Sequence, residues 1–389
     1  MSNLSKTIEL LSQLIAFDTT SRHSNLPLIE FIQQYLAKLG VDSTLVFNEE
    51  KSKANLIATI GPKDKAGIAL SGHTDVVPAE ADGWDSPPFE LNQRDGLLFG
   101  RGTCDMKGFI AAVLALAPQW QETRLSAPIH LCFSYDEEIG CLGVHSLIDH
   151  LETLPVKPFL AIIGEPSEMK LINGHKGKIA ISCNVKGTAG HSSFAPHHVN
   201  AIEYAARCIV YISDSADKIA EQGPFDASYT VPHSTMLTTM INGGTATNIT
   251  PDHCNFQFEM RHLPNHPADK VLGSIKEKID EELVPKMQKI APQADITWRT
   301  KFAYPGMTDA TNSEQFATIK HLFPEAAGKV SYGTEGGLFS AKGAIPSVIC
   351  GPGNIEQAHK RNEFVAIDQL EQCLDFLSNL VDEALTQKQ

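Results

Sequence analysis

Residues 68–75 read Ile-Ala-Leu-Ser-Gly-His-Thr-Asp, a short aliphatic run that opens directly into polar residues. Aliphatic runs of this length, bounded by turn-forming residues, are typical of buried strands. The pattern returns at 129–134, which leads into Asp136-Glu137-Glu138, and at 160–163, which leads into Gly164-Glu165-Pro166. Each of these three strands is therefore expected to end in polar side chains.

Helices are predicted between the strands, because apolar residues recur at helical spacing over 109–120 and 144–151. Strands that alternate with helices predict an α/β fold, with a mixed, mostly parallel sheet and helices on both faces. In such sheets, ligands bind beyond the carboxyl ends of the strands, where the polar residues lie. We therefore expect the functional site at that edge of the sheet.

From residue 179 the rhythm changes. The sequence predicts a strand, a helix, two strands and a charged helix, in that order, at 179–186, 200–213, 236–241, 253–261 and 268–289. This order fits a small antiparallel sheet backed by two helices, an α+β domain of the ferredoxin-like kind. The α/β rhythm returns after Trp298, so an insertion is predicted to interrupt one larger domain, with boundaries 1–178, 179–294 and 295–389.

The composition narrows the class of protein. The 389 residues are 42% hydrophobic and 20% charged, which is typical of a globular protein of about two domains. A net charge of −14 without a basic run disfavours nucleic-acid binding. The longest apolar stretch, 109–117, is too short to span a bilayer, and residues 1–6 begin no secretory signal. Eight scattered cysteines suit free thiols in a reducing compartment, so we expect a cytoplasmic protein without nucleic-acid or membrane partners.

Five imidazole or carboxylate side chains stand at predicted strand ends and in loops, and all are of metal-ligating types. They are His73, Asp105, Glu138, Glu165 and His359. Taken singly, each has an ordinary structural explanation; Asp105, for example, precedes a helix and suits an N-cap. Gathered at one sheet edge, they would repel and desolvate one another unless a cation were bound. The set therefore predicts a metal site.

The charge of this set indicates how many ions it binds. Two neutral imidazoles and three carboxylates carry three negative charges, so one divalent cation leaves the site negative and two bring it close to neutral. A bridged pair of ions about 3.5–4 Å apart fits this balance. Imidazole and carboxylate ligands suit Zn²⁺, with Co²⁺ or Mn²⁺ as substitutes. Asp105, in a glycine-flanked loop, is the best candidate for the bridging ligand.

Two further carboxylates stand beside these ligands. Asp75 lies two residues after His73 and can orient the imidazole by accepting its N–H, although a solvated turn residue fits the spacing equally well. Glu137 precedes Glu138 at a strand end, where adjacent side chains diverge. One of the two can bind metal while the other acts as general base toward water, a role that depends on the metal site being real.

Five motifs occur in one order along the chain. They are His73-Thr74-Asp75-Val76-Val77-Pro78, residues 100–108, Asp136-Glu137-Glu138, Gly164-Glu165-Pro166-Ser167 and Gly190-His191-Ser192-Ser193. With this series the chain resembles, over its full length, the co-catalytic dizinc peptidase and aminoacylase family. The resemblance implies a catalytic domain of the zinc-peptidase kind, interrupted by a lid or dimerisation domain through which a homodimer forms.

The resemblance also implies roles for individual residues. One metal ion would be held by His73, Asp105 and Glu165, and a second by Asp105, Glu138 and His359. Water activated by the metal ions would attack the amide, with Glu137 as the base. In the inserted domain, one residue would stabilise the oxyanion and two would bind polar groups and the carboxylate of the substrate, namely His191, Asn248 and Arg261.

Within the family, segments 174–177, 332–335 and 351–359 resemble members that deacetylate acetylornithine. Glu335 could pair with the distal ammonium group of ornithine, and it would disfavour an acidic succinyl tail. We therefore expect hydrolysis of N²-acetyl-L-ornithine to L-ornithine, a step of arginine biosynthesis. Gly336-Gly337 and the basic pair Lys360-Arg361 depart from some relatives and leave other N-acyl amino acids, such as acetylcitrulline, open.

Three other interpretations stay open. A desuccinylase or dipeptidase of the same family would share the metal-binding residues. A non-catalytic, metal-dependent binding protein would retain its ligand uncleaved. Cys104 with His73 could form a cysteine hydrolase, which is the weakest alternative because the resemblance implies that water is the nucleophile.

Overall fold

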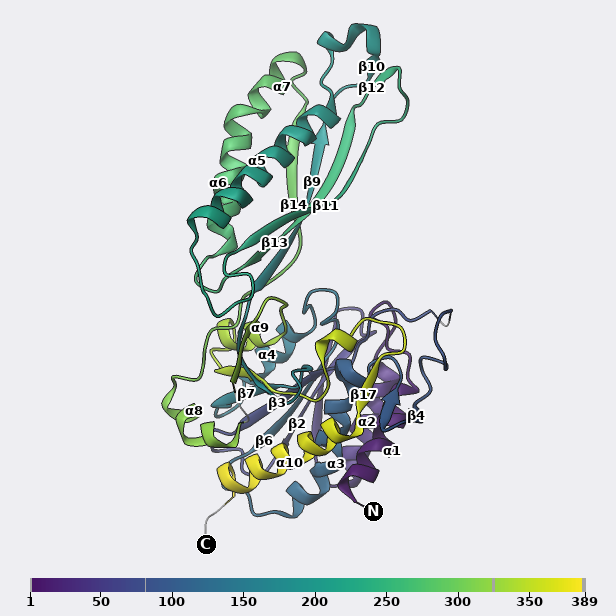
Figure 1. Cartoon of the computed structure of the whole chain (residues 1–389), viewed down its shortest axis with the longest axis vertical. Coiled ribbons are helices and arrows are strands. Elements are labelled where there is room, and N and C mark those ends of the chain that lie inside the picture. Colours follow the sequence, from purple (N-terminus) through teal and green to yellow (C-terminus); the bar gives the residue numbers. More distant parts are fainter. Residues whose placement is uncertain (1, 81, 324–325, 387–389) are drawn as a thin grey trace. The chain divides into compact units, whose positions relative to one another are not determined.

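The computed structural model describes residues 2–80, 82–323 and 326–386, and it divides into two compact units (Figure 1). The first unit comprises Met1–His175, Met307–Lys329 and Gly333–Gln389, and the second comprises Lys176–Gly306 and Val330–Tyr332. Each unit has a hydrophobic core of its own. The second unit therefore interrupts the chain of the first.

An eight-stranded mixed sheet forms the centre of the first unit. Its strands, in spatial order, are β1 (Ser43–Phe47), β2 (Ala54–Ile60), β6 (Ile129–Ser134), β3 (Ile68–His73), β7 (Leu160–Ile163), β16 (Ser347–Ile349), β8 (Leu171–His175) and β15 (Ala326–Val330). The central strands β6, β3, β7 and β16 run parallel to one another. Strands β3, β6 and β7 are buried along their whole length, which fits sequences that contain no Asp, Glu, Lys or Arg. The predicted α/β class is confirmed.

Helices cover both faces of this sheet. A side chain at Gly72 of β3 would meet Ile110 of α3 (Gly108–Glu122), whereas Ser71 bonds Glu335 at the start of α9 (Gly336–Ala341). Adjacent strand residues point to opposite faces, so α3 and α9 lie on opposite sides. The other helices of this unit are α1 (Asn3–Ile15), α2 (Leu26–Lys38), α4 (Val144–Glu152), α8 (Glu314–Ile319) and α10 (Ile367–Ala384), with short turns η1 (Thr103–Lys107), η3 (Lys320–Leu322) and η4 (Ile355–Gln357).

A small three-stranded sheet positions two functional loops. It consists of β17 (Phe364–Ala366), β5 (Leu97–Phe99) and β4 (Asn92–Arg94), in that spatial order. The pairing of Phe364 with Phe99 places the chain just before β17 beside the chain just after β5. These two loops carry His359 and Asp105.

The second unit is a ferredoxin-like α+β domain. Its antiparallel sheet has the order β11 (Thr235–Gly243), β13 (His253–His262), β9 (Gly177–Lys186) and β14 (Asp295–Tyr304). Buried and part-exposed residues alternate along β9 and β13, as expected where helices cover one face. The remaining elements are α5 (Ala201–Gln222), α6 (Ala268–Glu282), α7 (Val284–Ile290), η2 (Ser192–His197) and the paired strands β10 (Gly190–His191) and β12 (Ile249–Thr250).

Two boundaries differ from the sequence prediction. The helix predicted at 268–289 is two helices, because Pro285 lacks the N–H that a continuous helix needs and instead stands in the first turn of α7. The predicted insertion ends at residue 294, whereas the second unit extends to Gly306 because β14 pairs with β9 along its length. Among the described residues, every helix is too short or too polar to cross a membrane.

Candidate metal centre

The side chains of the five predicted metal ligands meet at the carboxyl edge of the main sheet. His73 ends β3, while Glu138 and Glu165 follow the neighbouring strands β6 and β7. His73 Nε2 lies 2.9 Å from Asp105 Oδ1 and 3.7 Å from Glu165 Oε1. His359 Nε2 lies 2.9 Å from Glu138 Oε2 and 3.3 Å from Asp105 Oδ2. The two histidines therefore approach opposite oxygens of one carboxylate.

Asp105 lies between two groups of potential ligands, in the position expected of a bridging carboxylate. Ligand atoms of His73, Asp105 and Glu138 lie within 4.8 Å of one another, and so do those of His73, Glu137 and Glu165. Asp105 is 6% exposed, and it lies in η1, directly before α3 begins. Nitrogen and carboxylate oxygen atoms at this spacing can hold two ions that share Asp105.

The imidazole of His73 is held by the backbone. Its Nδ1 donates a hydrogen bond to the carbonyl oxygen of Asp75 at 2.9 Å, and the side chain is buried. That bond fixes the ring orientation and directs Nε2 toward Asp105 and Glu165. Without metal, burial lowers the pKa of the ring, but the hydrogen bond from Nε2 to Asp105 and the charges of neighbouring carboxylates outweigh burial and raise that pKa well above its usual range. The ring is thus set up to bind metal through Nε2.

Burial and crowding shift the ionisation of the whole cluster. Burial raises the pKa of Glu137 to about 8 and that of Glu138 to about 7, and it raises the pKa of Glu165 well above its usual range. Hydrogen bonds to Asp105 and Glu138 raise the pKa of His359 to about 10. Neighbouring carboxylates also contribute to the raised pKa of each glutamate. Without metal, these carboxyl groups therefore tend to keep their protons, and a bound cation would stabilise their charged forms.

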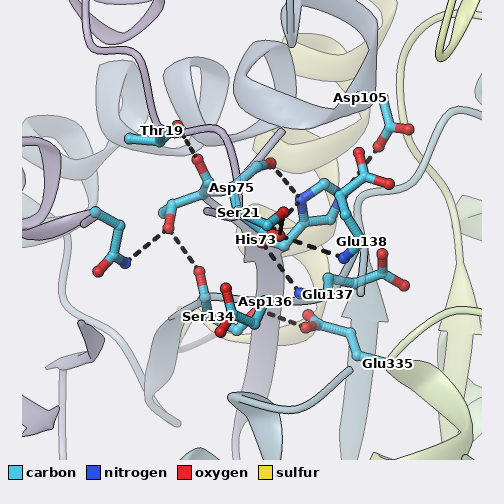
Figure 2. Close-up of polar contacts among 12 residues, drawn as sticks. Thr19, Ser21, His73, Asp75, Asp105, Ser134, Asp136, Glu137, Glu138 and Glu335 are labelled. Carbon is cyan, nitrogen blue, oxygen red and sulfur yellow. Dashed lines mark hydrogen bonds and ion pairs between the residues drawn. The ribbon is translucent and has the colours of Figure 1, made fainter. Parts of the chain in front are cut away.

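Asp75 acts differently from the prediction. Its carboxylate lies 3.6 Å from His73 Nδ1, too far for a hydrogen bond, and its backbone carbonyl accepts the imidazole N–H instead. The carboxylate accepts the backbone N–H groups of Glu137 at 3.1 Å and Glu138 at 3.3 Å, and the hydroxyl of Ser21 at 2.7 Å (Figure 2). Asp75 therefore fixes the loop that carries the candidate base.

Glu335 lies in the interior, which does not fit the predicted contact with a substrate ammonium group. It is fully buried on the sheet, where Ser71 of β3 donates to one of its oxygens at 2.5 Å. Ser134 of β6 donates to the other at 2.6 Å (Figure 2). Burial raises the pKa of this carboxyl group. Because β3 and β6 are adjacent, Glu335 links the two strands that end in His73 and in the Asp136–Glu138 loop.

The other three predicted residues belong to the second unit. Exposed His191 lies on β10, and pairing of β10 with β12 places it beside the turn that contains Asn248, whose carbonyl accepts the N–H of Ser192. His191 Nδ1 accepts the N–H of Ser193 at 3.3 Å and lies 2.7 Å from the Ser193 hydroxyl, and the tautomer with its proton on Nε2 fits both contacts. Part-buried Arg261, on β13, bonds Glu259 at 3.2 Å and the Ser331 carbonyl at 3.3 Å.

The structure also shows functional neighbours that the sequence did not reveal. Glu363, four residues after His359, accepts the backbone N–H of Asp105 at 3.1 Å and the guanidinium of Arg101 at 2.5 Å. Ser21 contacts Asp75, and buried Lys107 donates to the carbonyls of Leu14 and Phe17. An acidic residue shortly after His359 was the available signal for Glu363, but its burial could not be inferred from residue type.

Cys104 does not suit a nucleophile. Its thiol is buried and lies 3.4 Å from the carbonyl oxygen of Asn354, and burial beside Glu363 raises its pKa well above the usual range. The reactive form of cysteine is the thiolate, which this environment disfavours. Nε2 of His73, moreover, lies against Asp105. The cysteine-hydrolase alternative thus lacks an activated thiol.

Comparison with known proteins supports a hydrolase. Residues 69–383 match the sequence profile of peptidase family M20/M25/M40. Acetylornithine deacetylase of Pasteurella multocida (strain Pm70) is 32% identical over 393 residues, covering 99% of this chain and 100% of that protein. The match thus extends over the whole length of both chains.

Solved structures show the same fold at lower identity. An M20 family metallo-carboxypeptidase, Sso-CP2 from Sulfolobus solfataricus, superposes with a TM-score of 0.75 at 18% identity, covering 97% of this chain and 99% of that one. The YXEP protein of Bacillus subtilis, described as a dinuclear metal binding peptidase, superposes with a TM-score of 0.63 at 14% identity and 97% coverage of both chains. These likenesses confirm the fold.

Proposed function

The chain belongs to peptidase family M20/M25/M40, and from that premise we propose that this hydrolase removes acetate from N²-acetyl-L-ornithine to give L-ornithine, a step of arginine biosynthesis. One observation carries the chemistry: His73, Asp105, Glu138, Glu165 and His359 converge around one shared carboxylate, with Glu137 beside them. The substrate is proposed because a relative similar over its full length is an acetylornithine deacetylase.

We propose that the cluster binds two divalent metal ions. His73, Asp105 and Glu165 would hold one, and Asp105, Glu138 and His359 the other. The donors present fit this group, because two imidazoles and three carboxylates form the nitrogen and oxygen set that Zn²⁺ prefers and Co²⁺ accepts. Burial raises the pKa values of Glu138 and Glu165 and so disfavours their charged forms, which two divalent cations would stabilise.

When bound, such ions polarise an amide carbonyl and lower the pKa of water. In the proposed reaction, the Glu137 carboxylate takes a proton from the attacking water and delivers it to the nitrogen of the leaving amine. Burial raises the pKa of Glu137 in the metal-free protein, and bound cations would lower it again, toward the range in which the carboxylate can take and return a proton near neutral pH. Asp75 holds the Glu137 backbone, so the base stays at a fixed place beside His73 and Glu165.

Three residues of the second unit are proposed to act on the substrate. His191 would donate to the oxyanion from Nε2, the ring nitrogen that its hydrogen bond with Ser193 does not use. Arg261 would bind the substrate carboxylate through guanidinium N–H groups that Glu259 does not occupy. Asn248, exposed next to the His191 strand, would bind another polar group of the substrate.

A homodimer is proposed to form through the second unit. Strand β11 lies at the edge of its sheet and exposes Leu237, Met240 and Ile241, each more than half exposed. An apolar edge strand is a template for pairing, and two copies of β11 can pair antiparallel about a two-fold axis. Substituting Met240 by Lys should shift the sedimentation coefficient from dimer to monomer. A wild-type chain that sediments as a monomer would refute the dimer.

The proposed location is the cytoplasm. All eight cysteines are free and buried, as suits a reducing compartment. Fractionation of cells that express the full chain would test this directly, because enzyme activity should follow the cytoplasmic fraction.

A substrate panel tests the proposed reaction. One zinc-loaded preparation would be assayed on N²-acetyl-L-ornithine, N²-acetyl-L-citrulline, N-succinyl-diaminopimelate and a dipeptide. We expect the highest kcat/KM on acetylornithine and loss of activity after chelation, restored by Zn²⁺. A higher value on the succinyl compound or the dipeptide would assign another activity within the family. Binding of acetylornithine without release of acetate would instead indicate a non-catalytic binding protein.

A further inference from the structure

Two loops that carry potential metal ligands are joined away from the ligands themselves. Asp105 follows β5, and His359 precedes β17. These strands pair through Phe99 and Phe364, and the N–H of Gly100 donates to the carbonyl of Glu363 at 3.0 Å. The segment from His359 to Glu363 therefore lies along the loop that leads to Asp105.

Glu363 makes the closest contacts between the two loops. Its Oε1 accepts the backbone N–H groups of Cys104 at 2.9 Å and Asp105 at 3.1 Å, and its Oε2 accepts from Arg101 at 2.5 Å. Glu363 is 1% exposed and Arg101 is 3% exposed. These partners of the carboxylate all belong to residues 101–105, so its hydrogen bonds hold that loop in place.

We propose that Glu363 is a positioning residue for the metal centre: it fixes the backbone of Asp105 and, through the same chain segment, the distance from Asp105 to His359. This inference rests on the metal centre proposed above. The bridging carboxylate is then in place before any ion binds.

The electrostatics of the cluster explain why such a grip is needed. In the metal-free protein, the Asp105 carboxylate contacts the imidazoles of His73 and His359, and both contacts must give way when these side chains bind ions. Charge-assisted hydrogen bonds from backbone N–H groups to a carboxylate are among the strong ones, and burial strengthens them further. Arg101 pairs with Glu363, so the grip adds no net negative charge to the site.

His359 depends on its segment for its place. Its side chain is 55% exposed, and it contacts Asp105 and Glu138, which are themselves potential ligands. The place of a half-exposed ring depends on how firmly its backbone is held, because its side chain has freedom that burial would remove. Glu363, four residues later, supplies that anchor on the same loop to which the ring must point.

The test compares zinc binding by wild type, Glu363→Gln and a matched control. Glu356→Gln makes the same chemical change three residues before His359, at an exposed position. Chelator-competition titration of the metal-free proteins should show roughly 10–100-fold weaker zinc binding by Glu363→Gln, the usual cost of losing a partner that orients a ligand, and no change for the control. At saturating zinc, the kcat of Glu363→Gln should recover most of the wild-type value. Folded Glu363→Gln protein with wild-type zinc affinity would overturn the proposal.

A second measurement needs no variant. In metal-free wild-type protein, the amide protons of Cys104 and Asp105 should exchange slowly with solvent, because Glu363 accepts both before metal arrives. Fast exchange of these amides that slows only on addition of zinc would overturn the proposal, even if Glu363→Gln failed to fold. Wild-type protein that binds no zinc at all would instead refute the proposed metal centre, whatever the exchange rates.

Discussion

The carboxylate of Asp75 accepts the backbone N–H of Glu137 at 3.1 Å, while the carbonyl of the same Asp75 holds the imidazole of His73 (Figure 2). One residue at the end of β3 thus orients both a potential metal ligand and the candidate base on the neighbouring strand. The relative placement of these two groups therefore depends on Asp75 more than on either strand alone.

Replacing Asp75 by Asn should lower kcat about 10–100-fold, because an amide offers one acceptor oxygen where the carboxylate offers two. The charge of Asp75 also contributes to the raised pKa of Glu137. The acidic limb of the kcat–pH profile should therefore move to lower pH in this variant. Ser21→Ala, which removes one hydrogen bond to Asp75 and keeps its charge, should leave that limb in place. An unmoved limb in Asp75→Asn would contradict this coupling.

Glu137→Gln should retain metal and lose nearly all turnover. The amide preserves the shape of the side chain but cannot take a proton, and loss of a general base typically costs 10²–10⁴-fold in rate. Metal content per chain by elemental analysis and kcat on the same preparation measure the two effects separately. Glu90→Gln, the same change at an exposed position of the first unit, serves as the control. Activity near wild type in Glu137→Gln would remove this residue from the mechanism.

Zinc binding should release protons at pH 7.5. The pKa of His359 in the metal-free protein is about 10, so its ring is protonated there and must lose that proton to bind metal. Zinc affinity should rise with pH up to about 10. The pKa of His359 in the folded protein lies above the ordinary value of 6.5, so its protonation stabilises the metal-free fold. This stabilisation is fully present below pH 6.5 and is lost as the pH rises through 10. Calorimetry in two buffers of different ionisation enthalpy counts the protons; His359→Ala should release about one fewer. Equal release by both proteins would contradict the assignment.

Glu335→Gln should change stability and leave substrate preference intact. The carboxylate is buried against Ser71 and Ser134, so its loss acts on the packing of β3 and β6. Disturbing buried hydrogen bonds of this kind costs about 1–3 kcal/mol in unfolding free energy. Thermal unfolding and the ratio of kcat/KM for acetylornithine over N-acetylleucine measure the two effects. A fall in that ratio with unchanged stability would place Glu335 at the substrate after all.

Much of the first unit could be predicted because its strands are buried on both faces. Short runs rich in apolar residues identify β3, β6 and β7, and parallel strands share one carboxyl edge, so the meeting of His73, Glu138 and Glu165 follows from the fold. Strand β14 was not predicted, because most of its residues are at least partly exposed and its apolar pattern is weak.

Contacts over long sequence separations could not be predicted. The partners of Glu335 are 264 and 201 residues away, and those of Glu363 are about 260 residues away. Residue type alone does not distinguish a buried glutamate from an exposed one. The division of labour within Asp75, between its carbonyl and its carboxylate, depends on distances of a few tenths of an ångström that spacing cannot give.

Anomalous diffraction at the zinc edge, from crystals of the zinc-loaded enzyme, tests the shared two-metal centre most directly. Two peaks about 3.5–4 Å apart are expected, one bound by His73 and Glu165, the other by Glu138 and His359, with Asp105 between them. A single peak, or ions bound without Asp105, would contradict it.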